Sequence, residues 1–125
     1  MHMFYSLLIE VGKQLMGNQK LYKGSLQTII LMLLEENDKM YGYEITQRVK
    51  ELTKAELHIT EGVLYLVLYK LKAEGLLDVE VAKVDNRIRT YYKLTENGTK
   101  ETVSCLAEME EFLRTMQTIV NPKLA

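Results

Sequence analysis

The sequence contains one cysteine, one proline, seven glycines and no tryptophan among its 125 residues. One cysteine cannot form an internal disulfide bond, and it excludes the cysteine-rich zinc sites that stabilise many small domains. We therefore expect the chain to work in a reducing, cytoplasmic environment. The scarcity of glycine and proline predicts few long loops.

Long apolar runs and an excess of one charge are also missing. The longest uninterrupted apolar run, with tyrosine left out, covers six positions, 29–34, whereas a membrane-spanning helix needs about 20. The N-terminus lacks the basic flank and cleavage site of a secretory signal, so we expect no membrane association. The 16 basic and 17 acidic residues give a net charge of -1, so the overall charge does not indicate a nucleic-acid partner.

The sequence offers no arrangement of residues suited to catalysis or metal binding. The soft metal ligands His2, His58 and Cys105 fall on three different predicted elements, and a metal site needs ligands that converge. No nucleophile with a matching base, no Walker loop and no glycine-rich phosphate turn is present. We expect neither an enzyme nor a bound metal or cofactor.

The length and the hydrophobic periodicity predict one mainly helical domain with an appended helix. Apolar residues recur every three or four positions over about 4–16, 42–52 and 61–74, which predicts helices. The stretch 26–36 is apolar nearly all round, typical of a helix at the centre of a small domain. Ser25, Thr60 and Thr95 are predicted N-caps, and Gly75 is predicted to end the helix at 61–74.

The period then changes from 3.6 to 2. Leu77, Val79 and Val81 alternate with acidic residues, and residues 87–94 alternate again after a turn at 85–86. This pattern predicts a two-stranded β-hairpin. Residues 83–93 carry a net charge of +3, and a locally basic segment can bind phosphates even in a chain without net positive charge.

The last predicted helix begins after Thr95 and reaches about residue 120. Its apolar residues are spaced 3, 4, 3 and 4 apart, which is the pattern of a heptad seam: Leu106, Met109, Leu113, Met116 and Val120. Cys105, Phe112 and Ile119 widen this seam on one side. An exposed seam of that length predicts a homodimer, with further dimer contacts from Leu7, Val11 and Leu15 of the first helix.

Three helices followed by a hairpin is the order of a winged helix-turn-helix. In that architecture the helix at 61–74 enters the major groove and the hairpin forms the wing. We therefore expect a mainly α fold with a small β-hairpin. Residues 1–20 would form an N-terminal amphipathic helix, 21–95 the DNA-binding domain and 96–121 a dimerisation helix.

Five sequence blocks, in this order, resemble the PadR-like transcriptional regulators over about residues 23–100. They are Lys23-Gly24-Ser25-Leu26, Tyr41-Gly42-Tyr43-Glu44-Ile45, Gly62-Val63-Leu64-Tyr65 with Leu68 and Leu71, Glu74-Gly75-Leu76, and Arg87-Ile88-Arg89-Thr90-Tyr91-Tyr92-Lys93-Leu94-Thr95-Glu96-Asn97-Gly98. The resemblance implies a winged-helix dimer, usually a repressor, in which the C-terminal helix supplies dimer contacts.

Two positions depart from the family pattern. Val63 stands where the family usually has serine or threonine, so a hydroxyl that could hold a phosphate is missing. Leu66 stands where the family usually has proline, which puts a large apolar group near the groove-facing side. Some relatives stack planar drugs on a tryptophan, and this chain has none.

The predicted DNA-binding residues come from both helices of the pair and from the wing: Tyr43, Thr60, Tyr65, Tyr69, Lys70, Arg87, Arg89 and Lys93. The hydroxyls and charges of such residues can contact phosphates or base edges. For the tyrosines the alternative is packing at the helix rim, although the resemblance favours Tyr65 as a contact. For the charged residues the alternative is a solvated face.

These observations favour a homodimeric, sequence-specific DNA-binding regulator, a repressor that binds an inverted-repeat operator. The alternative is a winged-helix module that binds proteins and not DNA. Met109 and Met116, together with the apolar residues of the first helix, could also line a pocket for a small hydrophobic effector, because methionine adapts to irregular apolar shapes. Plain packing is the other reading of these residues.

Overall fold

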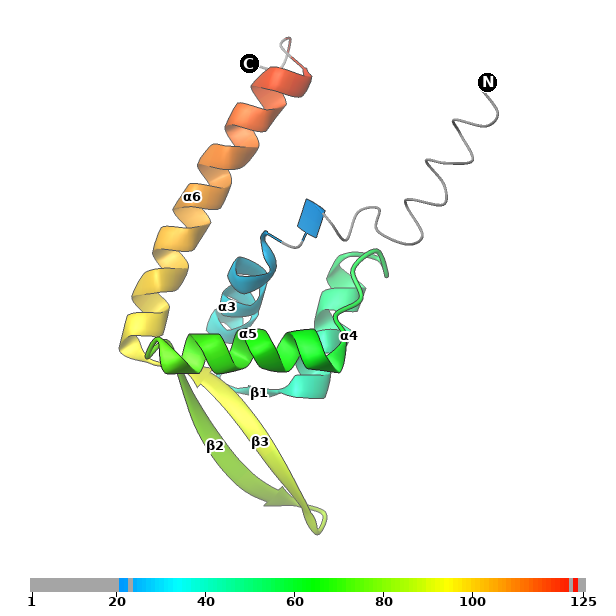
Figure 1. The fold of residues 1–125 in the computed structure, drawn as a ribbon, viewed down its shortest axis with the longest axis vertical. Coiled ribbons are helices and arrows are strands. Elements are labelled where there is room, and N and C mark those ends of the chain that lie inside the picture. Colours follow the sequence, from blue (N-terminus) through cyan, green and yellow to red (C-terminus); the bar gives the residue numbers. More distant parts are fainter. Residues whose placement is uncertain (1–20, 23, 122, 124–125) are drawn as a thin grey trace, which may run out of the picture.

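The computed structural model describes residues 21–22, 24–121 and 123. Its elements follow the order α3 (Leu26–Glu36), β1 (Met40–Tyr41), α4 (Gly42–Leu52), α5 (Glu61–Ala73), β2 (Leu77–Val84), β3 (Arg87–Leu94) and α6 (Glu96–Val120). In Figure 1, α6 extends from the centre in one direction and the β2–β3 hairpin in the other. The amphipathic helix expected over the first residues, with Leu7, Val11 and Leu15, lies outside the described residues.

Helix α3 forms the centre of the core, as its nearly uniform apolar character predicts. Ile30, Leu31 and Leu33 are completely buried, because helices pack around α3 on several sides. Helix α4 contributes buried residues at positions 45 and 49, and α5 contributes three at positions 64, 68 and 71. The predicted apolar stripe of α5 is therefore confirmed, whereas Leu52 at the end of α4 is half exposed.

The sheet has three antiparallel strands in the order β1-β3-β2. The sequence predicted only the hairpin, because the two residues of β1 are too few to show an alternating pattern. Met40 and Tyr41 pair with Tyr92 and Tyr91 of β3. Asp85 and Asn86 join the hairpin with φ of 49° and 62°, which are the positive values of a type I′ turn.

Two of the three predicted N-caps are confirmed. The Thr60 hydroxyl accepts a hydrogen bond from the Val63 N–H at 3.3 Å, and the Thr95 hydroxyl accepts one from the Gly98 N–H at 3.0 Å. Ser25 occupies the N-cap position of α3, but its backbone is helical and its side chain forms no capping bond. Ser25 therefore holds the predicted N-cap position without a capping hydrogen bond.

The end of α5 and the start of α6 are joined closely. Gly75 ends α5 with φ of 79°, and the Leu76 N–H bonds back to the Leu71 carbonyl at 3.0 Å, as in a Schellman motif. The Thr95 hydroxyl donates to the Gly75 carbonyl at 2.7 Å. A Cβ on Gly98 would overlap the Leu76 carbonyl oxygen, so only glycine allows this approach. These contacts fix the direction of α6 relative to the wing.

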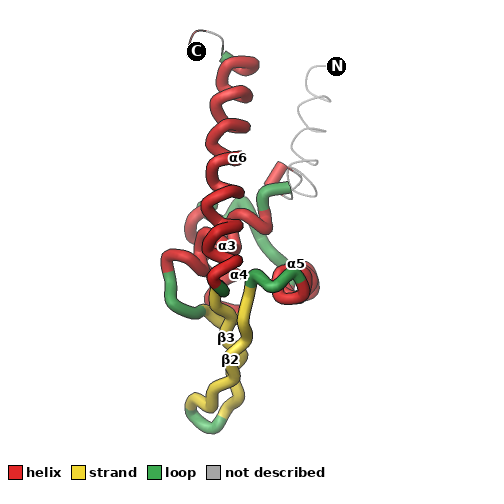
Figure 2. The backbone as a smooth tube through the Cα atoms, turned by 90° about the vertical axis from the view of Figure 1, so that its left-hand side faces the viewer, coloured by secondary structure: helices red, strands yellow, loops and turns green. Residues whose placement is uncertain are grey.

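Helix α6 is packed at its beginning and free at its end. Thr102 and Cys105 lie in the core beside α3, so Cys105 belongs to the core and does not widen the seam as predicted. Leu106 and Met109 are half-buried, and every residue from 111 to 120 is exposed. Figure 2 shows this second half extending beyond the rest of the described molecule. No helix within the described residues is long and apolar enough to cross a membrane.

Candidate nucleic-acid interface

Helix α5 presents one face to the core and the opposite face to solvent. The outward face carries Leu66, which is 71% exposed, and Tyr69, which is 75% exposed. Val63 and Lys70 lie beside them and are also exposed, one turn before and one turn after Leu66. Two of the predicted DNA-binding residues, Tyr69 and Lys70, therefore share this face.

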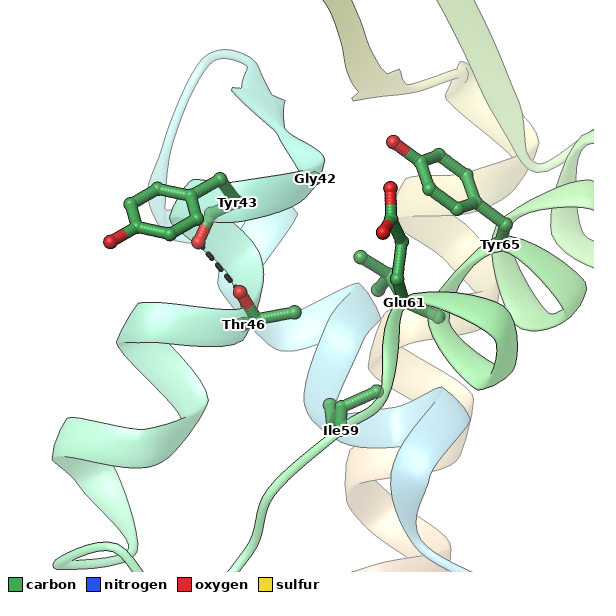
Figure 3. A pocket seen from close by; sticks show the side chains of 7 residues that line it. Gly42, Tyr43, Thr46, Ile59, Glu61 and Tyr65 are labelled. Carbon is green, nitrogen blue, oxygen red and sulfur yellow. Dashed lines mark hydrogen bonds between the residues drawn. The ribbon is translucent and has the colours of Figure 1, made fainter.

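The N-termini of α4 and α5 meet at a hollow of about 250 Å³. The residues that line the hollow are Gly42, Tyr43, Thr46, Ile59, Glu61, Leu64 and Tyr65 (Figure 3). The Tyr43 side chain points away from Tyr65 and is 66% exposed, while the Thr46 hydroxyl donates to the Tyr43 carbonyl at 2.8 Å. Thr60, the N-cap of α5, directly precedes Glu61 in the sequence, and Glu61 lines the hollow.

Tyr65 packs against the first residue of α4. A Cβ on Gly42 would lie 3.3 Å from the Tyr65 hydroxyl and 3.3 Å from a Leu64 methyl group, so the absence of a side chain at Gly42 accommodates the ring. The ring remains 46% exposed. It also lies close enough to Tyr92 to help raise the pKa of that phenol, which is raised mainly by burial. Tyr65 therefore combines packing at the helix rim with an accessible edge.

Each of the two helix starts carries an acidic residue in its first turn. The Glu44 carboxylate accepts a hydrogen bond from the Tyr41 backbone N–H at 3.1 Å, which gives it a structural role in the first turn of α4. The Glu61 carboxylate lies in the hollow near Tyr65 (Figure 3). A carboxylate in the first turn of a helix is favourable against the helix dipole.

The basic residues of the wing lie on one face of β3. Because side chains alternate along a strand, Arg87, Arg89 and Lys93 share the face that also carries Tyr91. The cross-strand pair Tyr41–Tyr91 continues this face onto β1. The other face carries Tyr92, which is buried at the base of the hairpin, and Ile88, which is 78% exposed near its tip. The hairpin projects beyond the helices, so its apolar face is covered only at the base.

Arg89 is held by aromatic rings. Its guanidinium carbon lies 4.1 Å from the centroid of the Tyr41 ring, within the range of a cation–π interaction. Tyr41 and Tyr91 meet edge to face with centroids 5.7 Å apart. A hydrogen bond with the Tyr91 side chain raises the pKa of Arg89 above its ordinary value. Lys39 completes the cluster, 4.8 Å from the Tyr91 ring and 3.3 Å from the Glu80 carboxylate.

The predicted phosphate-binding charges have few acidic partners. Lys70 lies 3.9 Å from Glu74, and both side chains are largely exposed, so this pair contributes little and can exchange for another anion. Arg87, Arg89 and Lys93 form no ion pair with any carboxylate in the part of the chain that the structure describes. The described residues also contain no group of three side chains that could hold a metal ion.

The structure thus arranges the predicted residues in three neighbouring groups. Tyr69 and Lys70 lie on the outward face of α5, Tyr43, Thr60 and Tyr65 lie at the helix starts, and the three wing residues lie along β3. In Figure 1 the hairpin descends from the end of α5, on the side opposite to α6.

Sequence reasoning missed the aromatic support of the wing. Strand alternation could have placed Tyr91 beside Arg89, but Tyr41 and Lys39 reach this face only through β1, which leaves no periodic signal.

Comparison with known proteins shows which family and fold this chain is similar to. Residues 30–103 match the transcriptional regulator PadR-like family. The chain is 32% identical over 78 residues to the transcriptional regulator Rv3488 of Mycobacterium tuberculosis, a match covering 62% of this chain and 70% of that protein.

Two solved structures show the same fold over most of their length. A transcriptional regulator from Clostridium thermocellum is 29% identical with a TM-score of 0.69, covering 82% of this chain and 96% of that one. A PadR-like transcription factor from Bacteroides fragilis is 33% identical with a TM-score of 0.65, covering 80% and 94%.

Proposed function

Because the chain belongs to the PadR-like family of transcriptional regulators, we propose that it is a homodimeric repressor that binds an inverted-repeat operator. Members of this family regulate transcription and are not enzymes. The observation that carries the proposal is the combination of an exposed α5 face with a basic wing beside it. A repressor of this kind must reach DNA, so we expect it to act in the cytoplasm.

The two surfaces have different roles in this proposal. Helix α5 enters the major groove and brings Tyr65, Tyr69 and Lys70 to the DNA, while Tyr43 and Thr60 contact phosphates at its rim. Arg87, Arg89 and Lys93 bind the adjacent backbone from the wing. Residues 21–95 would then form the DNA-binding unit.

In this proposal residues 96–121 form the dimer interface. Leu106, Met109, Leu113, Met116 and Val120 lie along one side of α6, and its second half has no cover within the described residues. A second copy that packs against this seam would give a two-fold dimer with two α5 helices, which matches the symmetry of an inverted repeat. The residues 7, 11 and 15, outside the described residues, would add contacts.

The seam also supplies a place for regulation. Met109 and Met116 lie along it, and methionine side chains adapt to irregular apolar shapes. A small hydrophobic effector held between the two copies would change the separation of the α5 helices and release the operator.

Footprinting of the DNA upstream of the chain's own gene tests the proposal. We expect two protected half-sites whose centres are about 34–36 Å apart, with protection lost as salt rises. A single asymmetric half-site would contradict the dimer. No protection at any salt concentration would favour the second candidate, a module that binds proteins, for which the apolar α5 face is the supporting observation.

A further inference from the structure

Over its first two turns, the outward face of α5 offers carbon rather than hydrogen-bonding groups. Val63 and Leu66 lie one turn apart and are 44% and 71% exposed. Gly62 lies beside them, and a Cβ at that position would have no neighbour within 4 Å. The first two turns of the helix can therefore approach another surface closely. The side chains that would contact that surface, Val63 and Leu66, are aliphatic.

Most of the side chains that read bases through paired hydrogen bonds are absent from this helix. Residues 61–73 contain no arginine, asparagine or glutamine, and lysine, in the last turn, is the only residue type left that can contact guanine through two hydrogen bonds. Glu61, the one acidic residue, lies in the hollow beside Tyr65 (Figure 3). The lysines Lys70 and Lys72 are point charges suited to phosphates. On the outward face of the first two turns of α5, apolar contact is thus the main means of base recognition that remains.

In the major groove, the apolar feature of the bases is the 5-methyl group of thymine. We propose that Val63 and Leu66 determine the operator sequence by packing against thymine methyl groups in each half-site. This inference rests on the proposed DNA-binding function and specifies which bases that function selects. DNA is the favoured occupant because Lys70 borders the apolar face and the basic wing lies beside it, a charge pattern complementary to phosphates.

The contribution of each methyl contact can be estimated. Burying one methyl group changes an equilibrium constant about fourfold. If each half-site presents one buried methyl group, loss of both lowers affinity about 15-fold. Leu66 is 71% exposed, so its truncation removes the contact without opening a cavity in the protein.

The test uses a short duplex that the intact chain selects from a randomised pool. The same duplex is synthesised with deoxyuridine in place of thymidine, which removes only the methyl groups. We expect uracil to lower affinity at least about fourfold, and Leu66→Ala to bring the thymine-to-uracil ratio towards one. Val103→Ala serves as the matched control, because it truncates an aliphatic side chain on α6 that is 61% exposed.

The possible outcomes distinguish a failure of thymine recognition from a failure of the proposed DNA binding. Equal affinity for the thymine and uracil duplexes would overturn the proposed recognition of thymine methyl groups and leave DNA binding intact. A uracil effect that Leu66→Ala and Val63→Ala both leave unchanged would overturn the role of these side chains. If the chain selects no duplex from the pool, the proposed function fails as well, and the apolar face is then a docking surface for a protein.

Discussion

The apolar seam of α6 should hold the dimer together. Leu113→Asp combined with Met109→Lys places two charges on the seam without changing the net charge of the chain. Leu113 is 52% exposed and Met109 is half-buried, so neither change disturbs the centre of the core. We expect the double variant to remain folded and to be monomeric.

The expected magnitude follows from the exposed area. Phe112, Leu113, Met116, Ile119 and Val120 are 38% to 75% exposed, which together equals about three whole apolar side chains in each copy. At roughly 1.5–3 kcal/mol for each side chain, two copies gain about 9–18 kcal/mol from burying them. That gain is large enough to offset an association cost of about 4–15 kcal/mol.

The double variant removes apolar burial at two positions in each copy and adds charges that lose their water. We expect a loss of at least about 4 kcal/mol from these effects, which raises the dimer dissociation constant by about a thousandfold. Sedimentation equilibrium measures this change directly. Ser104→Asp with Thr115→Lys is the matched control, because it adds the same charges to the opposite side of α6 and should leave the dimer intact. A stable monomer for the unmutated chain would show that the α6 seam does not form a dimer interface.

Three further predictions concern the wing and the core. Tyr41→Ala removes the ring beneath Arg89 and should lower affinity for the selected duplex about two- to fivefold, measured by fluorescence anisotropy; equal loss in Tyr41→Phe, which keeps the ring, would contradict the role of stacking. Gly98→Ala creates the overlap with the Leu76 carbonyl oxygen described above and should lower the free energy of unfolding by about 3 kcal/mol. Gly62→Ala, at a position with open space, should raise it by roughly 0.5–1 kcal/mol. Urea unfolding that gives the two variants the same stability would count against this close approach. Burial raises the pKa of the Cys105 thiol, so the unfolded chain releases this proton first and stability should fall as pH rises above about 8.5; a fall of the same size in Cys105→Ala would show that other groups cause it.

The elements that the sequence predicted are those with a long periodic pattern. Helices α3, α4, α5 and α6 and the β2–β3 hairpin each span at least eight residues, enough for an apolar period to repeat. Strand β1 has two residues, and its pairing with β3 depends on tertiary structure. Tyr41 could not be placed beside Arg89 for that reason.

The sequence pattern also could not predict which side chains are buried at the edges of the molecule. Ile88 follows the same alternation as Tyr92, yet it is 78% exposed while Tyr92 is buried, because the hairpin projects past the helices that cover its base. The spacing of Cys105 places it at the side of the seam. Because α3 packs against that turn of α6, the Cys105 side chain is buried in the core instead. Periodicity identifies a face, and the length of the neighbouring elements decides how much of that face is covered.

Whether the wing and α5 bind DNA is tested most directly by the salt dependence of affinity for the selected duplex. Arg87→Ala with Arg89→Ala removes two charges from each copy, or four from a dimer. Each phosphate contact contributes about -0.9 to the slope of log K against log salt, so we expect a slope that is shallower by up to about 3.6 in this variant. Lys100→Ala with Arg114→Ala removes the same charge from α6 and should leave the slope unchanged. An unchanged slope and affinity in the wing variant would show that the basic strand is a solvated face, and it would contradict the account.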